Sequence, residues 1–201
     1  HNEWRGYRDL AEQLPAYARE LGFTHIEFLP VSEYPFDGSW GYQPTGLFAP
    51  TSLVGPPEDF AALVDACHRE GLEVVLDVVY NHLGPEGNYL AMFAPYFTAN
   101  YRTPWGPAVN LDGPDSDHVR RFFIENALYW VTECRIDALR LDAVHAIHDE
   151  SAYPFLQELR EAFHGEAERL GRRVYVSPES SLNDTRLLRP VAAGGMGTPR
   201  S

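Results

Sequence analysis

One nearly continuous apolar stretch, Leu72 to Tyr80, constrains the fold of this chain most strongly. Within Val74–Val79 only Asp77 is polar, and β-branched residues predominate. Apolar side chains on both faces of a strand are typical of a parallel sheet that is covered on both sides. The stretch therefore predicts a buried parallel strand.

Amphipathic helices are predicted before and after this strand. The preceding segment repeats apolar residues at helical spacing and ends at Gly71. The inner faces expected for four helices are Leu10, Leu14, Tyr17 and Leu21, then Phe60, Leu63, Val64 and Cys67, then Val119, Phe122, Phe123, Ala127 and Trp130, and finally Phe155, Leu156, Leu159 and Phe163. Pro15 is expected near a helix start or a kink, because proline lacks a backbone N–H. Ser116 or Asp117 is expected to cap the third helix.

Three more segments have the pattern of short strands, namely His25–Leu29, Ile136–Leu141 and Val174–Val176. Strand–helix–strand units without hairpins predict an α/β fold with a parallel sheet. A closed (β/α)₈ barrel needs eight strands, so the chain is expected to form part of a TIM barrel. An open doubly wound sheet is the alternative. Its dinucleotide-binding form is disfavoured, because no G-x-G-x-x-G follows a strand.

Two segments are predicted as long loops, from Ser32 to Pro57 and from Leu83 to Pro114. Both are rich in residues that favour turns. Loops of this length within a compact domain are usually functional.

The charge and composition exclude several classes of partner. The 201 residues carry a formal net charge of −13, which argues against a nucleic acid or an anionic membrane as partner. No run of 18 apolar residues is present to span a membrane. No signal-peptide pattern follows His1, which favours the cytoplasm. Cys67 and Cys134 fit two buried thiols in a reducing compartment.

Polar residues follow three of the predicted strands, at the ends where a barrel carries its active site. Each acid has a simpler explanation when taken alone, since Asp142 could pair with Arg140 and Glu179 could be an exposed loop acid. Three strands with the same feature favour a shared site. The polar segments are Asp77–His82 (including Asn81), Arg140–His145 and Ser177–Glu179.

Glycoside hydrolysis is the chemistry that suits these residues. A retaining glycosidase uses a nucleophilic carboxylate and a proton-donating carboxylic acid roughly 5–5.5 Å apart. Arg140 lies two residues before Asp142 and so points to the same side of the strand. The guanidinium would keep Asp142 ionised, as a nucleophile requires. Glu179 could hold its proton if it is partly desolvated.

Three segments together resemble the characteristic motifs of the α-amylase family, glycoside hydrolase family 13. They are Asp77–His82, Leu139–His145, and Glu179 followed by Leu182-Asn183-Asp184. The resemblance implies a catalytic barrel over residues 1–190, roughly strands 2 to 5 of eight, with a loop insertion at about 83–114. Residues 191–201 differ from the family and are expected to be an atypical tail.

The resemblance also implies a role for each site residue. Asp142 would be the nucleophile and Glu179 the acid/base, while Asp77 and Asn81 would organise the site. The residues expected to bind sugar are Arg140 and His82 around the attacked unit, Trp40 and Tyr42 in the loop that stacks on it, and His145 in an acceptor subsite. No cofactor and no required metal are predicted, because no His, Asp or Glu grouping has metal-ligand spacing.

Two groups of enzymes within the family come closest. Asn81–Trp105 and Asn126–Trp130 resemble malto-oligosyltrehalose trehalohydrolases, whereas Ser39–Gly46 and Ala49–Ser52 also resemble glucan branching enzymes. The longer match favours retaining hydrolysis that releases trehalose from malto-oligosyltrehalose. Glycosyl transfer by a branching enzyme is one alternative, and an inactive truncated fragment is another.

Two features depart from the family pattern. Pro178 precedes Glu179, where a residue such as alanine is expected, and a proline stiffens the approach to the acid. The family's third carboxylate, an Asp after a later strand, has no counterpart before Ser201.

Overall fold

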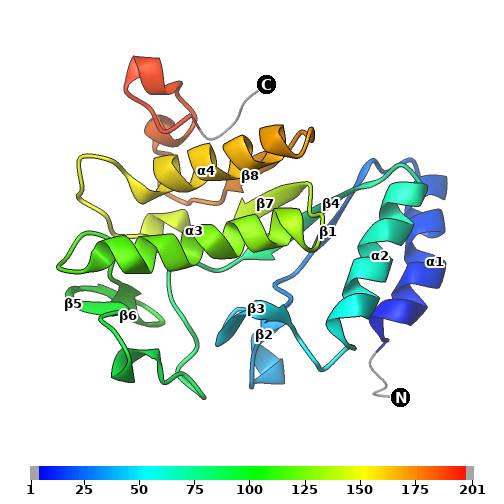
Figure 1. Ribbon diagram of the computed structural model, residues 1–201, viewed down its shortest axis with the longest axis horizontal. Coiled ribbons are helices and arrows are strands. Elements are labelled where there is room, and N and C mark those ends of the chain that lie inside the picture. The colour runs from blue at the N-terminus through cyan, green and yellow to red at the C-terminus, as the bar shows by residue number, and fades with distance from the viewer. Residues whose placement is uncertain (1–4, 198–201) are drawn as a thin grey trace.

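A four-stranded parallel sheet forms the centre of the computed structural model, which describes residues 5–197. The strand order is β1-β4-β7-β8, so each strand lies beside its sequence neighbour in this sheet (Figure 1). The strands are His25–Phe28 (β1), Glu73–Val78 (β4), Ala138–Leu141 (β7) and Tyr175–Pro178 (β8). This arrangement confirms the predicted α/β class with a parallel sheet.

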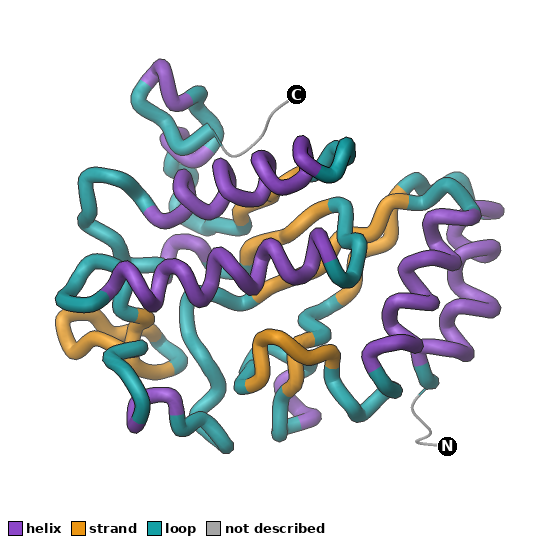
Figure 2. The backbone as a smooth tube through the Cα atoms, in the orientation of Figure 1, coloured by secondary structure: helices purple, strands orange, loops and turns teal. Residues whose placement is uncertain are grey.

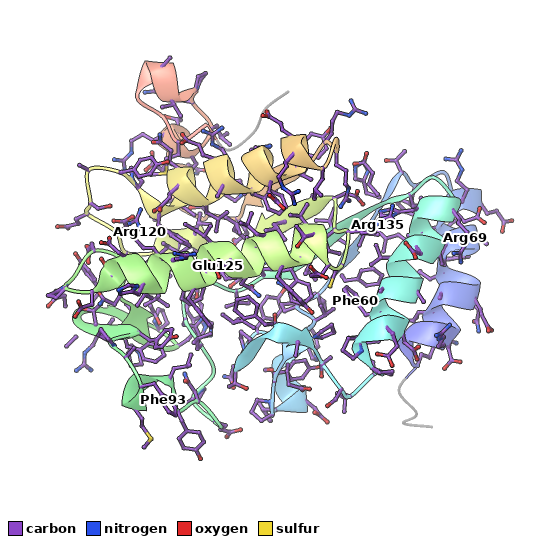
Figure 3. The ribbon with its side chains drawn as sticks, viewed as in Figure 1. Phe60, Arg69, Phe93, Arg120, Glu125 and Arg135 are labelled. Carbon is purple, nitrogen blue, oxygen red and sulfur yellow. The ribbon has the colours of Figure 1, made fainter. Side chains whose placement is uncertain are left out.

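An α-helix precedes each strand of this sheet. The helices are Tyr7–Glu20 (α1), Pro57–Arg69 (α2), Ser116–Thr132 (α3) and Phe155–Arg169 (α4). Helix α1 packs beside α2, and α3 packs beside α4 (Figure 1). Phe60, labelled in Figure 3, is fully buried together with Phe123, Trp130 and Phe163. The apolar faces predicted for α2, α3 and α4 supply much of the core, and the repeated helix–strand unit is that of a partial barrel. The face predicted for α1 was wrong in part, because Tyr17 and Leu21 are 61% and 56% exposed.

The two segments predicted as loops contain short antiparallel hairpins, so the prediction of unbroken loops was wrong. The first holds Ser32–Glu33 (β2) and Gly46–Pro50 (β3), and the second holds Phe97–Thr103 (β5) and Gly106–Val109 (β6). Both ladders have a register shift, which breaks the alternation that reveals a strand in a sequence. The hairpins follow the carboxyl ends of β1 and β4 and lie on the same side of the sheet (Figure 2).

Two expected helix starts also differ from the structure. Pro15 lies in the interior of α1, which begins at Tyr7, so the helix extends further towards the amino terminus than expected. Asp115, with φ of 60°, precedes α3, and no side chain caps that helix. Phe122 is only partly buried and packs against the rim of the core, with edge-on contacts to Phe48 and to the buried Phe123.

The remaining features of the fold are the two cysteines, the expected tail and five short 3₁₀ helices among the described residues. Cys67 and Cys134 are buried free thiols, as predicted. Among the described residues of the expected tail, Gly197 donates a backbone hydrogen bond to Arg189, and residues 198–201 lie outside the described residues. No helix within residues 5–197 is long and apolar enough to cross a membrane. The short 3₁₀ helices are Asp37–Ser39 (η1), Leu90–Met92 (η2), Val144–Ala146 (η3), Thr185–Leu187 (η4) and Val191–Ala193 (η5).

Asp137 ties together the amino-terminal side of the sheet. Its carboxylate accepts hydrogen bonds from His68 Nε2 at 2.7 Å, from the Val74 backbone N–H at 2.8 Å and from Arg172 Nη2 at 2.7 Å. Burial alone would raise the pKa of Asp137, but these hydrogen bonds, led by His68, lower it below its ordinary value. The ionised carboxylate therefore joins α2, β4 and the segment before β8.

We expect Asp137→Ala to lower the free energy of unfolding by about 3 kcal/mol or more, because it leaves three donors without their acceptor. Because the pKa is lowered on folding, the contribution of Asp137 is present above 3.8, its ordinary value, and is lost as the pH falls through the folded pKa. Chemical denaturation of the wild type and of Asp137→Ala, at neutral pH and at about pH 2, checks this prediction. The difference between their free energies of unfolding must shrink in acid. Asp65→Ala removes an exposed ion pair with Arg135 and is the matched control. Equal losses in the two variants would contradict the prediction.

Candidate active site

Arg140 joins the carboxylates that follow two neighbouring strands. Its Nη1 atom donates to Asp77 Oδ2 at 2.8 Å and to Asp142 Oδ1 at 2.9 Å. Residues Asp77 and Arg140 are register partners in the β4–β7 pair. As expected from their spacing, Arg140 and Asp142 lie on the same side of the strand. The guanidinium thus fixes both acids at the carboxyl ends of the sheet.

Glu179 enters the same cluster from β8. The strands β7 and β8 are adjacent, and the Glu179 backbone N–H donates to the Leu141 carbonyl oxygen at 2.9 Å. Its Oε2 atom lies 3.8 Å from Arg140 Nη2 and accepts a hydrogen bond from the Ala143 N–H at 2.7 Å. Asp142 and Glu179 therefore contact the same guanidinium group. From the sequence, Glu179 was expected to be partly shielded from water. Its side chain is 40% exposed, so the residues that the structure describes shield it only in part.

Asp77 is held in place by hydrogen bonds from two neighbouring side chains, Tyr42 and Arg140. The Tyr42 hydroxyl donates to Asp77 Oδ2 at 2.7 Å. Burial raises the pKa of Asp77 above its ordinary value, and the hydrogen bonds from Tyr42 and Arg140 offset only part of this. Burial, and next the Asp77 contact, raise the pKa of Tyr42, so its hydroxyl stays a donor. Burial would lower the pKa of Arg140, but Asp77 raises it.

Asn81 and His82 support Asp142 from the segment that follows β4. Asn81 Nδ2 donates to the Asp142 backbone oxygen at 2.8 Å and to its Oδ2 atom at 3.1 Å. Together with Arg140, this places one hydrogen bond on each carboxylate oxygen of Asp142. The His82 ring contacts Asn81 Oδ1 through Nδ1. Burial lowers the pKa of His82, which favours the neutral imidazole.

Two further residues predicted to bind sugar are Trp40 and His145. Trp40 is 69% exposed and lines a cavity of about 540 Å³ with Phe28 and Tyr34, beside the open edge of β1. Gly41 follows with φ of +87°, and an added Cβ would come 2.1 Å from the Pro30 oxygen, so only glycine fits this turn. His145 lies in η3, and its Nδ1 atom is buried with no hydrogen-bond partner among the described residues.

Sequence reasoning missed one residue of this region. Trp105, at the end of the β5–β6 hairpin, stacks on His82 with ring centroids 5.1 Å apart and an interplanar angle of 21°. In the sequence, Trp105 stands out only as the end of the segment Asn81–Trp105, which carries the resemblance to trehalohydrolases. Trp105 is far along the chain from His82, so the sequence alone does not predict that the two rings touch. The contact follows from the path of the β5–β6 hairpin.

Within residues 5–197, no group of three or more His, Cys, Asp or Glu side chains is placed to hold a metal ion. The cluster instead places the carboxylates of Asp142 and Glu179 around the Arg140 guanidinium, which the buried Asp77 also contacts. Such an arrangement can supply a nucleophile and a proton donor at a sugar bond.

The partial barrel and its strand-end carboxylates have the form of a glycoside hydrolase site. Residues 4–103 match the family described as alpha amylase, catalytic domain. Together with the relatives below, this match shows that the chain belongs to the α-amylase family.

Two kinds of curated relatives are similar to this chain. A 1,4-alpha-glucan branching enzyme of Bradyrhizobium diazoefficiens is 55% identical over 150 residues, which are 71% of this chain and 20% of that protein. A malto-oligosyltrehalose trehalohydrolase of Rhizobium sp. is 44% identical over 195 residues, which are 96% of this chain and 32% of that protein. The chain thus spans a fifth to a third of the length of these relatives. Branching enzymes and trehalohydrolases are both similar to this chain, so family membership does not decide which of the two reactions applies.

Solved structures agree on the fold. The crystal structure of an α-amylase-like protein from Salmonella typhimurium has a TM-score of 0.80 and 43% identity, and covers 89% of this chain and 30% of that one. An α-amylase of Geobacillus thermoleovorans, complexed with acarbose, has a TM-score of 0.74 at 21% identity, covering 91% of this chain and 42% of that one. At that identity the likeness concerns the fold alone.

Proposed function

We propose that residues 1–190 are part of the catalytic barrel of an enzyme that hydrolyses α-1,4-glucans with retention, most specifically one that releases trehalose from malto-oligosyltrehalose. The observation that carries the proposal is the shared contact of Asp142 and Glu179 with Arg140. Residues 83–114 are the loop insertion of this barrel, and residues 191–201 are an atypical tail. The proposed substrates are neutral glucans, the proposed location is the cytoplasm, and no cofactor is required.

In the proposed mechanism Asp142 attacks the anomeric carbon while Glu179 gives its proton to the departing glycosidic oxygen. The first product leaves with that proton, and the sugar is held as an ester on Asp142. Glu179, now ionised, takes a proton from water as the water oxygen attacks the anomeric carbon. The ester bond breaks, Asp142 is released as a carboxylate, and Glu179 again carries its proton.

The hydrogen bonds of Asp142 suit the nucleophilic role. Arg140 and Asn81 each donate a hydrogen bond to one of its oxygens, which fixes the plane of the carboxylate. Asp77 accepts hydrogen bonds from both Arg140 and Tyr42, so we assign Asp77 to organising the site and Tyr42 to binding sugar there. We also assign Trp40 and His145 to sugar binding.

The alternative is transfer to a sugar hydroxyl, as in a branching enzyme. It is favoured by the 55% identity to the Bradyrhizobium branching enzyme, which exceeds the 44% identity to the Rhizobium trehalohydrolase. The trehalohydrolase match extends over 96% of the chain, against 71% for the branching enzyme, and this longer coverage supports hydrolysis.

We expect the intact enzyme that contains this chain to release trehalose from malto-oligosyltrehalose and to form no α-1,6 branches. Chromatography of the products, with linkage analysis of amylose incubated with the enzyme, checks both points. New α-1,6 linkages without trehalose would decide for the branching enzyme. The Asp142→Asn variant, run in parallel, shows which products depend on the site.

A further inference from the structure

The segment that follows β7 begins at one of the two proposed catalytic carboxylates and binds the other. Asp142 is followed directly by Ala143, whose backbone N–H donates to Glu179 Oε2 at 2.7 Å. The next N–H, that of Val144, donates to the Glu179 backbone oxygen at 2.9 Å. Because Oε2 accepts an N–H, it carries no proton, and Oε1 is the oxygen left to carry one. The Ala143 N–H therefore sets the direction in which the proposed acid presents its proton.

Ala143 has an unfavourable backbone conformation. Its φ of 43° and ψ of 50° lie in the left-handed region, which alanine rarely adopts because its Cβ crowds the neighbouring carbonyl oxygen. Such a conformation persists only where the surrounding structure fixes the chain on either side of it. On the amino-terminal side, the Asp142 N–H donates to the Val78 oxygen of β4 at 3.0 Å. The contacts on the carboxyl-terminal side come from beyond η3.

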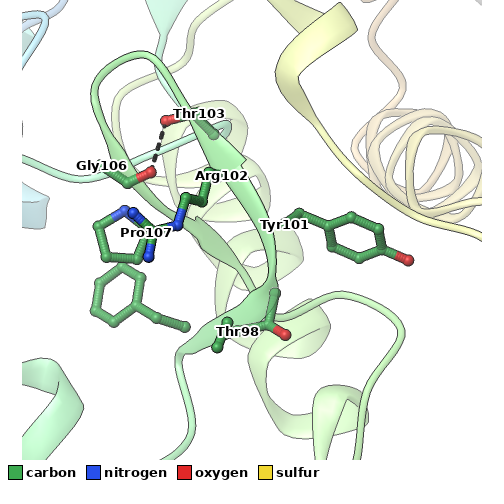
Figure 4. Close-up of a pocket in the computed structure, with 8 residues that line it drawn as sticks. Thr98, Tyr101, Arg102, Thr103, Gly106 and Pro107 are labelled. Carbon is green, nitrogen blue, oxygen red and sulfur yellow. Dashed lines mark hydrogen bonds between the residues drawn. The ribbon is translucent and has the colours of Figure 1, made fainter.

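The β5–β6 hairpin and the residues after it supply those contacts. Tyr101, on β5, stacks on His148 with ring centroids 4.9 Å apart and an interplanar angle of 10°. Its hydroxyl donates to Asp112 Oδ2 at 2.7 Å, and the same oxygen accepts the Glu150 N–H at 3.0 Å. Figure 4 shows the Tyr101 ring on the side of the strand opposite Pro107. We call Tyr101, Asp112, His148 and Glu150 together the tyrosine latch.

The tyrosine latch is fixed to helix α3. Arg120 of that helix is buried, and its Nη1 atom donates to the Leu111 oxygen at 2.9 Å and to Asp149 Oδ2 at 3.0 Å. Leu111 and Asp149 are chain neighbours of latch residues, so both segments that meet in the latch are held by one side chain. The hydrogen bond to Asp112 raises the pKa of Tyr101 to about 12, so its hydroxyl remains a donor at neutral pH.

We propose that Tyr101 is a positioning residue, which holds the Ala143 N–H against Glu179 through residues 142–150. This inference rests on the proposed function and adds a residue that acts on the acid from outside the carboxylate cluster. Without the latch, Ala143 relaxes towards an ordinary backbone conformation, and Glu179 presents its proton less accurately. Only a step that needs this proton is slowed.

The test gives the intact enzyme two substrates that differ in their need for the acid. The leaving oxygen of malto-oligosyltrehalose must be protonated, whereas the fluoride of α-maltotriosyl fluoride leaves without a proton. The kcat/KM values are compared, because this ratio measures transition-state stabilisation relative to free enzyme and substrate. Tyr101→Ala should lower kcat/KM about tenfold for malto-oligosyltrehalose and change it less than about twofold for the fluoride. Amylose, whose leaving oxygen needs the same proton, is the substrate if the enzyme forms branches.

Two further variants give a reading if Tyr101→Ala folds poorly. Tyr101→Phe keeps the ring on His148 and loses only the hydroxyl, so it should show the same selectivity with a loss of about threefold. Tyr153→Ala is the matched control, because Tyr153 lies in the same connection between β7 and α4 and is 43% exposed. Its hydroxyl donates to Glu161 of α4, not to the hairpin, so both kcat/KM values should equal those of the wild type.

The Glu179→Gln variant separates failure of this inference from failure of the proposed function. It should lower kcat/KM for malto-oligosyltrehalose by at least about 100-fold and spare the fluoride. If it does so, equal losses with both substrates in the Tyr101 variants, or no loss with either, would overturn the positioning role and leave the proposed function standing. If Glu179→Gln lowers both values alike, the assignment of the acid fails, and the positioning role fails with it.

Discussion

Replacing Asp142 with asparagine should lower the kcat of the intact enzyme by at least about 10⁴-fold, the scale of loss on removing a catalytic nucleophile. The amide has nearly the same shape and can still accept a hydrogen bond from Arg140, which now lies 2.9 Å from Oδ1. It cannot form the ester that retention requires. Initial rates with malto-oligosyltrehalose, measured beside thermal unfolding, separate loss of chemistry from loss of fold.

Asp65→Asn is the matched control for this substitution. Asp65 lies on α2, is half exposed, and among residues 5–197 pairs with Arg135 alone, away from the site cluster. Its activity should equal that of the wild type. An Asp142→Asn variant that keeps more than about a tenth of the wild-type rate would be incompatible with nucleophilic catalysis by this residue.

Residues 1–201 expressed alone should show no glucan hydrolysis above an Asp142→Asn control of the same length. Among the described strands, β1 and β8 each pair on one side only, whereas a barrel closes when its first strand pairs with its last. Leu29, beside the open edge of β1, is 52% exposed. Unpaired edges and exposed apolar side chains favour aggregation over a rigid site.

The missing third carboxylate adds to this expected loss. The family resemblance implies that it holds and distorts the bound sugar, and contacts of this kind contribute several kcal/mol to the transition state. Each 1.36 kcal/mol is about tenfold in rate, so the expected deficit is several orders of magnitude. A reducing-sugar and trehalose assay of the purified chain is the measurement. Activity well above the Asp142→Asn control would show that residues 1–201 are sufficient.

The central sheet could be predicted from the sequence because its signals are local. The run Val74–Val79 and the helical spacing of residues such as Phe60 and Trp130 report burial directly. Arg140 and Asp142 could be placed together for the same reason, since two residues along one strand share a side.

The parts that were missed depend on contacts between distant segments. The β5–β6 ladder has a register shift between Thr98 and Arg102, so no clean alternation marks it. Asp137 gathers partners from 35 and 69 residues away, which no periodicity can reveal. Trp105 reaches His82 only because the hairpin turns back over the carboxyl ends of the strands.

The identity of the nucleophile is the central claim, and trapping the glycosyl-enzyme tests it most directly. In a Glu179→Gln variant, a 5-fluoro-α-glucosyl fluoride can still form the ester, because fluoride leaves without a proton, whereas hydrolysis of the ester is slow without the base. Peptide mass spectrometry should find one added fluoroglucosyl unit on Asp142. A label on any other side chain, or no label while fluoride is released catalytically, would contradict the assignment of Asp142.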